Sequence, residues 1–172
     1  MSRQLLIMRH AKSSWDNPDL SDYQRPLANR GLRDAPKMGR WMRSAGHIPD
    51  HVVASPAQRA QHTASLVCQS LGLAEEAIEW NPAIYNADLK DLLEVLSKVP
   101  ERFNLTLLIG HNPGLEFLLT YLGGRTSDVS ADQELIKTAS LALLKLPSDW
   151  TKLTPGCGTV MWVRHPKEIV ET

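Results

Sequence analysis

The sequence has little cysteine, no excess of charge and no long apolar run. Its two cysteines, Cys68 and Cys157, lie far apart and form no zinc-ligand pattern, so we expect reduced thiols and a cytoplasmic protein. Lysine plus arginine (19) equals aspartate plus glutamate (19), and a chain without net charge is a poor candidate for a general nucleic-acid binder. Apolar stretches such as Leu105–Ile109 and Leu115–Leu122 fall short of the roughly 18 residues of a membrane span, so we expect no membrane association.

Several catalytic motifs are also missing. There is no G-x-x-x-x-G-K-[ST] loop, which argues against a P-loop enzyme, and no G-x-G-x-x-G after the first apolar run, which argues against dinucleotide binding. The G-x-S-x-G motif, which carries the nucleophilic serine of α/β-hydrolases, is absent too. A metal hydrolase would need carboxylates grouped with histidines, and no spacing supports such a role for Asp88 or Glu116. We therefore expect no metal and no organic cofactor.

The apolar runs that are present predict an α/β protein. The length of 172 residues fits one domain, 1–172, and an apolar content of 42% argues against disorder. Strands alternating with helices predict parallel βαβ units, and continuous apolar strands are typical of a sheet covered on both faces. The expected strands are Leu5–Met8, Val52–Ala54, Ile78–Trp80, Leu105–Ile109, Ser140–Leu146 and Thr159–Arg164.

Four helices are expected between these strands. After the second strand, Ser55 is predicted to cap a helix and Pro56 to fill its first position, with Gly72 beyond its end. A helix from about Arg33 to Ala45 contains Pro36, so we expect it to begin late or to kink. The other two expected helices are Ala87–Val99 and Leu115–Leu122.

Three strand ends carry the candidate functional residues. Arg9 and His10 end the first strand, Arg59 lies in the first turn after the second, and His111 follows the third. Because ligands of such sheets bind at the carboxyl ends of the strands, we expect these four side chains to converge. Two arginine forks and free N–H groups at helix N-termini suit a dianion, and phosphate is the obvious one.

The paired histidines predict chemistry in addition to binding. A neutral imidazole is a competent nucleophile near neutral pH, and attack on phosphorus would give a covalent phosphohistidine that is later hydrolysed. The arginines would neutralise the charge on the phosphoryl group. The other histidines offer less: Pro49 separates His47 from His51, His62 either lines the pocket or flanks it, and His165 has no evident partner.

Four blocks of sequence, in order, resemble the histidine phosphatase superfamily with its phosphoglycerate-mutase-like fold. The resemblance implies a three-layer α/β/α sandwich with a mostly parallel central sheet. Within the superfamily, the short chain without large insertions is most similar to the SixA-type phosphohistidine phosphatases. The blocks are Leu6–Asp16, Arg25–Gly31, Ser55–Ala64 and Gly110–Gly114.

The resemblance also implies roles for single residues. His10 would be the phosphorylated nucleophile, with Arg9, Arg59 and His111 completing the phosphate pocket. Asn17, next to the position at which mutase relatives have a phosphate-contacting asparagine, would bind phosphate. Arg25 would touch substrate or stabilise the loop over the pocket, or else only pair with Asp22; Lys12 is expected to be a solvated charge.

The leaving group of the substrate distinguishes between the activities that the sequence leaves open. Where mutase-like relatives have a glutamate general acid, this chain reads Ala83–Ala87, and nearby Asp88 is better suited to capping a helix. An alkoxide leaving group needs a strong acid, whereas an imidazole does not. We therefore expect a metal-independent phosphatase that acts on phosphohistidine in a protein, with His111 as the only nearby proton donor. The alternatives are a small-molecule phosphomonoesterase or mutase and a non-catalytic phosphate-binding module. The sequence does not give the oligomeric state, and we expect a monomer.

Overall fold

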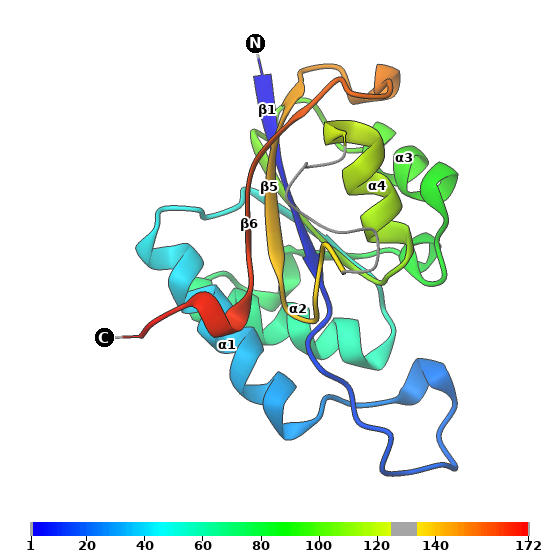
Figure 1. The fold of residues 1–172 in the computed structure, drawn as a ribbon, viewed down its shortest axis with the longest axis vertical. Coiled ribbons are helices and arrows are strands. Elements are labelled where there is room, and N and C mark those ends of the chain that lie inside the picture. Colours follow the sequence, from blue (N-terminus) through cyan, green and yellow to red (C-terminus); the bar gives the residue numbers. More distant parts are fainter. Residues whose placement is uncertain (1, 125–133, 172) are drawn as a thin grey trace.

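A six-stranded sheet forms the centre of the protein (Figure 1). The computed structural model describes residues 2–124 and 134–171. The strand order is β3-β2-β4-β1-β5-β6. The strands are β1 (Ser2–Arg9), β2 (His51–Ala54), β3 (Ile78–Trp80), β4 (Leu105–Gly110), β5 (Leu141–Pro147) and β6 (Thr159–Arg164).

The sheet is mostly parallel, as the sequence predicts. β1 pairs with β4, β4 with β2 and β2 with β3, all in parallel. β5 runs antiparallel to β1, and β6 antiparallel to β5. The carboxyl ends of β1, β4 and β2 therefore lie side by side at one edge of the sheet.

Helices cover both faces, which confirms the three-layer prediction. In Figure 1, α1 (Asn29–Ser44) and α2 (Gln58–Leu71) lie on one side of the sheet, and α3 (Leu89–Ser97) and α4 (Gly114–Gly123) lie on the other. No helix within residues 2–124 and 134–171 is both long and apolar enough to cross a bilayer. The short 3-10 helices are η1 (Asp22–Gln24), η2 (Glu75–Ala77), η3 (Pro82–Ile84), η4 (Trp150–Lys152) and η5 (Pro166–Glu168).

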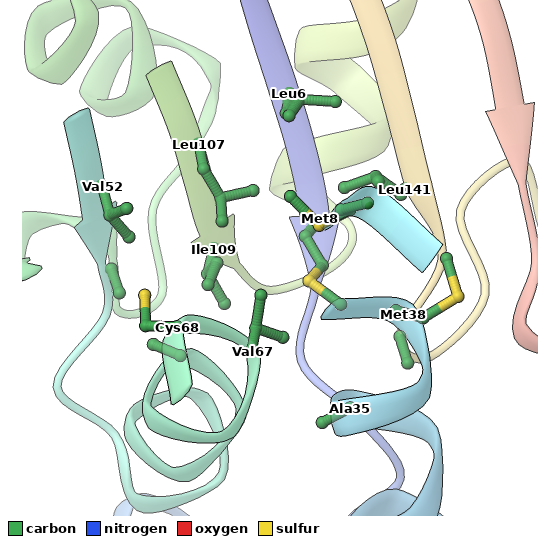
Figure 2. Close-up of a cluster of buried hydrophobic side chains, with 14 of the residues drawn as sticks. Leu6, Met8, Ala35, Met38, Val52, Val67, Cys68, Leu107, Ile109 and Leu141 are labelled. Carbon is green, nitrogen blue, oxygen red and sulfur yellow. The ribbon is translucent and has the colours of Figure 1, made fainter. Parts of the chain in front are cut away.

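Each helical layer packs on the sheet through its own cluster of buried side chains. Figure 2 shows the α1–α2 side, where Met38 of α1 and Val67 of α2 point toward Met8 of β1 and Ile109 of β4. Alternate residues of the same strands face the α3–α4 layer. Burial on both faces explains why β1 reads as a continuous apolar run and not as an alternating one.

Two predicted helix starts are wrong, and the cause is tertiary contact in both cases. α1 begins at Asn29, so Pro36 lies inside the helix. Its first turn is held against the chain after β1: the N–H of Ala28 donates to the carbonyl of Lys12, and Gly31 packs so closely there that a Cβ would lie 2.3 Å from that carbonyl oxygen. Contact across the fold thus outweighs the local preference of proline for a helix start.

The second correction concerns the helix that follows β2. The cap of α2 is Ala57 and not Ser55, and the helix begins at Gln58. The Ser55 hydroxyl accepts from the N–H of Ala57 at 3.2 Å and bonds to His111, so it is engaged before the helix begins. The predicted helix end is confirmed, because Gly72 adopts a left-handed φ of 76° at the C-cap of α2.

Candidate active site

Three adjacent strand ends bring the predicted residues together. Arg9, the last residue of β1, pairs with Gly110, the last residue of β4. The N–H of His10 then donates to the carbonyl of Gly110 at 3.0 Å, which fixes the exit of the chain from β1. The imidazole rings of His10 and His111 lie with their centroids 5.2 Å apart. We call His10, Arg9, Arg59 and His111 the His10 cluster.

His10 is held in the state that a nucleophile requires. Its Nδ1 lies 2.8 Å from the carbonyl oxygen of Ala11. Because a carbonyl oxygen only accepts, Nδ1 carries the proton, and Nε2 keeps its lone pair. Burial, with a smaller contribution from the charges of Arg59 and Arg9, lowers the pKa of His10 to about 3. The ring is therefore neutral at physiological pH.

His111 is neutral for the same reason. Burial, followed by the charge of Arg59, lowers its pKa to about 4. Its Nε2 lies 2.8 Å from Oγ of Ser55, the first residue after β2. Ser55 thus links the ends of β2 and β4 and orients the second histidine of the cluster.

Arg59 is oriented by Asp22, a residue that the sequence analysis did not assign to the site. Its Nη1 donates to the carbonyl of Asp22 at 2.6 Å, and its Nη2 donates to Oδ2 of the same residue at 3.0 Å. Tyr85 donates its hydroxyl to this Oδ2 at 2.7 Å and places its ring edge-on to His111. Asp22 therefore joins η1 to α2 and η3 beside the His10 cluster.

Asp22 is held ionised by these donors. Burial acts to raise the pKa of its carboxyl, but the hydrogen bonds from Tyr85, Arg59 and Arg25 outweigh burial and lower it to about 2. A carboxylate with so low a pKa carries no proton at neutral pH. It acts as a counter-charge to Arg59 and cannot serve as a general acid.

Arg25 is buried in the loop that leads to α1. It donates to Oδ1 of Asp22 at 2.9 Å, to the hydroxyl of Ser13 and to the carbonyl of Ser14 at 3.3 Å. Its guanidinium also stacks on the exposed ring of Trp15, 3.3 Å from the ring centroid. Arg25 does pair with Asp22, but it is buried and its contacts also hold the loop, so it is more than a surface ion pair; direct contact with substrate stays a prediction.

Arg9 is positioned from the other side by the segment that precedes β5. Its Nη1 lies 3.3 Å from Oε1 of Glu134 and donates to the carbonyl of Ile136 at 3.3 Å. Asn112, next to His111, donates to the same carbonyl at 2.9 Å and to Glu116 at 2.7 Å. The Nε of Arg9 is buried without a partner in the described chain, as is Nδ1 of His111. Such unpaired buried atoms call for a ligand or an ordered water.

Other residues named from the sequence lie apart from these contacts. Asn17 is exposed, and its side-chain oxygen accepts from the N–H of Asp19 at 3.0 Å, with no bond to the His10 cluster among the described contacts. Lys12 is exposed, as expected. Asp88 caps α3 by accepting from the N–H of Asp91 at 2.8 Å, which confirms its capping role.

Thr63, and not its neighbour His62, connects α2 to the chain just after His10. Its buried hydroxyl accepts from the N–H of Ala11 at 3.0 Å and donates to the carbonyl of Arg59 at 2.7 Å. One hydroxyl thereby fixes the spacing between the residue after His10 and the helix turn that carries Arg59. No group of three or more histidine, cysteine or acidic residues suited to a metal ion occurs in the described ranges.

The comparisons with known proteins agree with this geometry. Residues 5–104 match the profile of the histidine phosphatase superfamily (branch 1). An uncharacterised protein of Mycobacterium tuberculosis is 30% identical over 169 residues, which cover 93% of this chain and 100% of the relative. An uncharacterised chloroplastic protein of Arabidopsis thaliana is 32% identical over 153 residues, which cover 84% of this chain and 67% of the relative.

Among solved structures, the protein histidine phosphatase SixA in complex with tungstate superimposes with a TM-score of 0.79. The identity is 25%, and the match covers 96% of this chain and 98% of that one. The chain belongs to the histidine phosphatase superfamily.

Proposed function

We propose that the protein is a phosphatase that removes the phosphoryl group from phosphohistidine in a protein, through a covalent intermediate on His10. The observation that carries the proposal is a neutral histidine, held with a free Nε2 lone pair beside two arginines, at a site where residues 2–124 and 134–171 offer no available carboxylic acid. The similarity to SixA, whose solved complex holds the tetrahedral oxyanion tungstate, supports a phosphoryl ligand at this cluster.

In the first step, Nε2 of His10 attacks phosphorus. A bond forms between Nε2 and phosphorus, and the bond between phosphorus and the substrate imidazole breaks. Arg9 and Arg59 stabilise the charge on the transferring oxygens, which is the main contribution that a protein makes to phosphoryl transfer. A substrate ring protonated on its far nitrogen leaves as neutral imidazole, so the enzyme need not supply a strong acid.

In the second step, water attacks the phosphorus of phospho-His10. The bond between Nε2 and phosphorus breaks, inorganic phosphate is formed, and the proton lost by water goes to phosphate or solvent. Throughout, the carbonyl of Ala11 keeps the proton on Nδ1. Phospho-His10 is therefore a protonated ring that leaves as neutral imidazole, which makes the intermediate easy to hydrolyse.

The carboxylates near the site favour this substrate class over alkyl phosphates. Asp22 is ionised, Asp88 is engaged as a helix cap, Glu134 faces Arg9, and Glu116 accepts from Asn112 and from the N–H of Leu135. A very basic alkoxide needs general acid catalysis, which is typically worth about 10²–10⁴-fold. Without it, phosphohistidine, with its weakly basic leaving group, should react faster.

The test compares kcat/KM for a phosphohistidine peptide with kcat/KM for sugar phosphates and 3-phosphoglycerate. We expect the peptide to be preferred by a wide margin, and Asp88→Asn to leave that preference unchanged. A large preference for an alkyl phosphate that Asp88→Asn removes would make Asp88 the acid and the protein a small-molecule phosphatase. Absence of turnover with every substrate, despite phosphate binding, would leave a non-catalytic phosphate-binding module.

A further inference from the structure

A basic cleft lies next to the His10 cluster, on the α1 side of the sheet. It has a cavity volume of about 420 Å³ and is lined by residues of α1, of the segment before β5 and of the chain around η5. In Figure 1 the C-terminal segment with η5 runs beside α1. The lining residues are Arg30, Asp34, Lys37, Lys137, Thr138, His165, Pro166 and Lys167.

The positive charge of the cleft is largely uncompensated. Lys37, Lys137 and Lys167 make no salt bridge within the described residues. Asp34 pairs with Arg30 at 3.9 Å and is the one carboxylate among the described residues that line the cleft. The whole chain has equal numbers of basic and acidic residues, so this excess is a local feature and not a consequence of composition.

Acidic residues at the border of the cleft are paired elsewhere. Glu171 bonds to Arg40 of α1 at 2.6 Å, and the charge of Lys37 adds to that bond in lowering the pKa of its carboxyl. Glu168 lies 3.9 Å from Nε2 of His165, whose Nδ1 is bonded to Ser140. These contacts leave the three lysines of the cleft as the groups that an incoming anion would meet.

The walls of the cleft are attached to the backbone of the nucleophile. The N–H of Ala139, which follows Lys137 and Thr138, lies 3.1 Å from the carbonyl oxygens of both Arg9 and His10. The opposite wall begins at Arg30, whose Nη2 donates to Thr138 at 3.3 Å, and the next residue, Gly31, packs on the backbone of Lys12. A ligand in the cleft therefore lies within a few residues of His10 on both walls.

We propose that the basic cleft docks an acidic segment of the phosphorylated protein whose phosphohistidine is presented to His10. This inference rests on the proposed function and specifies its protein partner. Carboxylate side chains complement the cleft in charge, and lysines suit them because an ammonium is a point charge that accepts varied geometries. Four cations on three separate segments match an extended acidic surface better than one compact ion.

The consequence is a salt-dependent preference for protein substrates. Charges around a binding site raise association rates by about 10–10³-fold, and this effect weakens as salt screens them. The preference should be lost when the lysines are reversed, because like charges then oppose docking. A small substrate that reaches only the His10 cluster should be unaffected.

The experiment uses the double variant Lys137→Glu/Lys167→Glu, in which both exchanged side chains are exposed. We measure kcat/KM for an acidic phosphohistidine protein and for free phosphohistidine, at low and at high salt. We expect the variant to lose about tenfold or more with the protein at low salt, and nothing with free phosphohistidine. The variant Lys137→Arg/Lys167→Arg should retain wild-type activity with both.

The matched control reverses Lys90 on α3 and Lys152 on η4, two exposed lysines outside the cleft, and should change neither rate. Equal losses with the protein and with free phosphohistidine, or no loss with either, would overturn the docking inference while the proposed function stands. A wild-type enzyme inactive on phosphohistidine would overturn the proposed function alone. In that case, binding of a fluorescent glutamate-rich peptide still decides docking: binding that the reversal abolishes supports it, and no binding refutes it.

Discussion

Acid should destabilise this protein well before its carboxylates titrate, because the two histidines of the His10 cluster are buried in neutral form. A histidine whose pKa is lowered by folding binds its proton more readily in the unfolded chain. Its contribution is therefore unfavourable to the folded state below pH 6.5, and increasingly so until the folded pKa is reached. The folded values are about 3 for His10 and about 4 for His111.

The magnitude follows from these values. At pH 5 both rings remain neutral in the folded state. In the unfolded chain both are protonated, because the pH is then about 1.5 units below the ordinary histidine pKa of about 6.5. At about 1.36 kcal/mol per unit, each ring costs about 2 kcal/mol, and the two together about 4 kcal/mol. A typical domain has about 5–15 kcal/mol of total stability, so the loss is large. Asp22 does not contribute between pH 7 and pH 5. Its effect on stability falls between the ordinary carboxyl pKa of 3.8 and its folded pKa of about 2.

The assay is urea unfolding at pH 7 and pH 5, for the wild type and for His10→Gln/His111→Gln. Glutamine is polar and does not titrate, so the double variant should lose about 4 kcal/mol less than the wild type over this interval. Burial also lowers the pKa of His47, His51 and His165, and their contributions cancel in the comparison. An identical loss in both proteins would refute the neutral-histidine reasoning, as would an acid limb of kcat/KM near pH 6.5.

Four further predictions concern the chemistry. His10→Ala should abolish turnover with the fold retained in circular dichroism, and an acid-labile phosphoenzyme trapped in the wild type should map to His10; appreciable turnover by the variant would contradict the assignment. Activity should survive EDTA, because two arginines supply the positive charge at the site; loss with EDTA and recovery with a divalent ion would contradict this. Arg59→Lys should lower kcat/KM by about 10²-fold, since one ammonium cannot replace two charge-assisted bonds worth about 1.5–3 kcal/mol each; near-normal rates would make Arg59 a steering charge only. Asp22→Asn should tighten inhibition by inorganic phosphate and lower kcat, because Arg59 loses its counter-charge and the product phosphate leaves more slowly; unchanged phosphate affinity would exclude charge compensation.

The sequence predicted the His10 cluster because the rule behind it is geometric. Parallel strands end at one edge of a sheet, so residues that follow the strand ends must meet there. Arg9 and His10 after β1 and His111 after β4 needed only the correct strands, and apolar runs buried on both faces are the strongest local signal in this chain. Arg59 needed one more step, a helix starting within a few residues of β2.

The residues that support the cluster could not be found in this way. Asp22 and Tyr85 come from loops and 3-10 turns, where no periodicity predicts the path of the chain. The one available signal was the spacing of Asp22 and Arg25, which suggested a pair but gave no hint of its contact with Arg59. The sequence predicts only an ordinary helix residue at Thr63 and a helix cap at Ser55. It gives no indication of the distant group to which each hydroxyl bonds.

Each arginine of the His10 cluster contacts a carboxylate of the protein, Asp22 for Arg59 and Glu134 for Arg9. Two uncompensated arginines close to a buried His10 would repel each other and would bind the product phosphate too tightly for release. The carboxylates reduce both effects, and they fix the guanidinium groups before substrate arrives, so less ordering remains to be done in the transition state. Because the Asp22 carboxylate accepts from Arg59, Arg25 and Tyr85, its removal should disturb turnover more than removal of Glu134, which makes one contact with Arg9 at 3.3 Å. We therefore expect these two carboxylates, which the strand-end rule did not predict, to set the balance between phosphate capture and phosphate release.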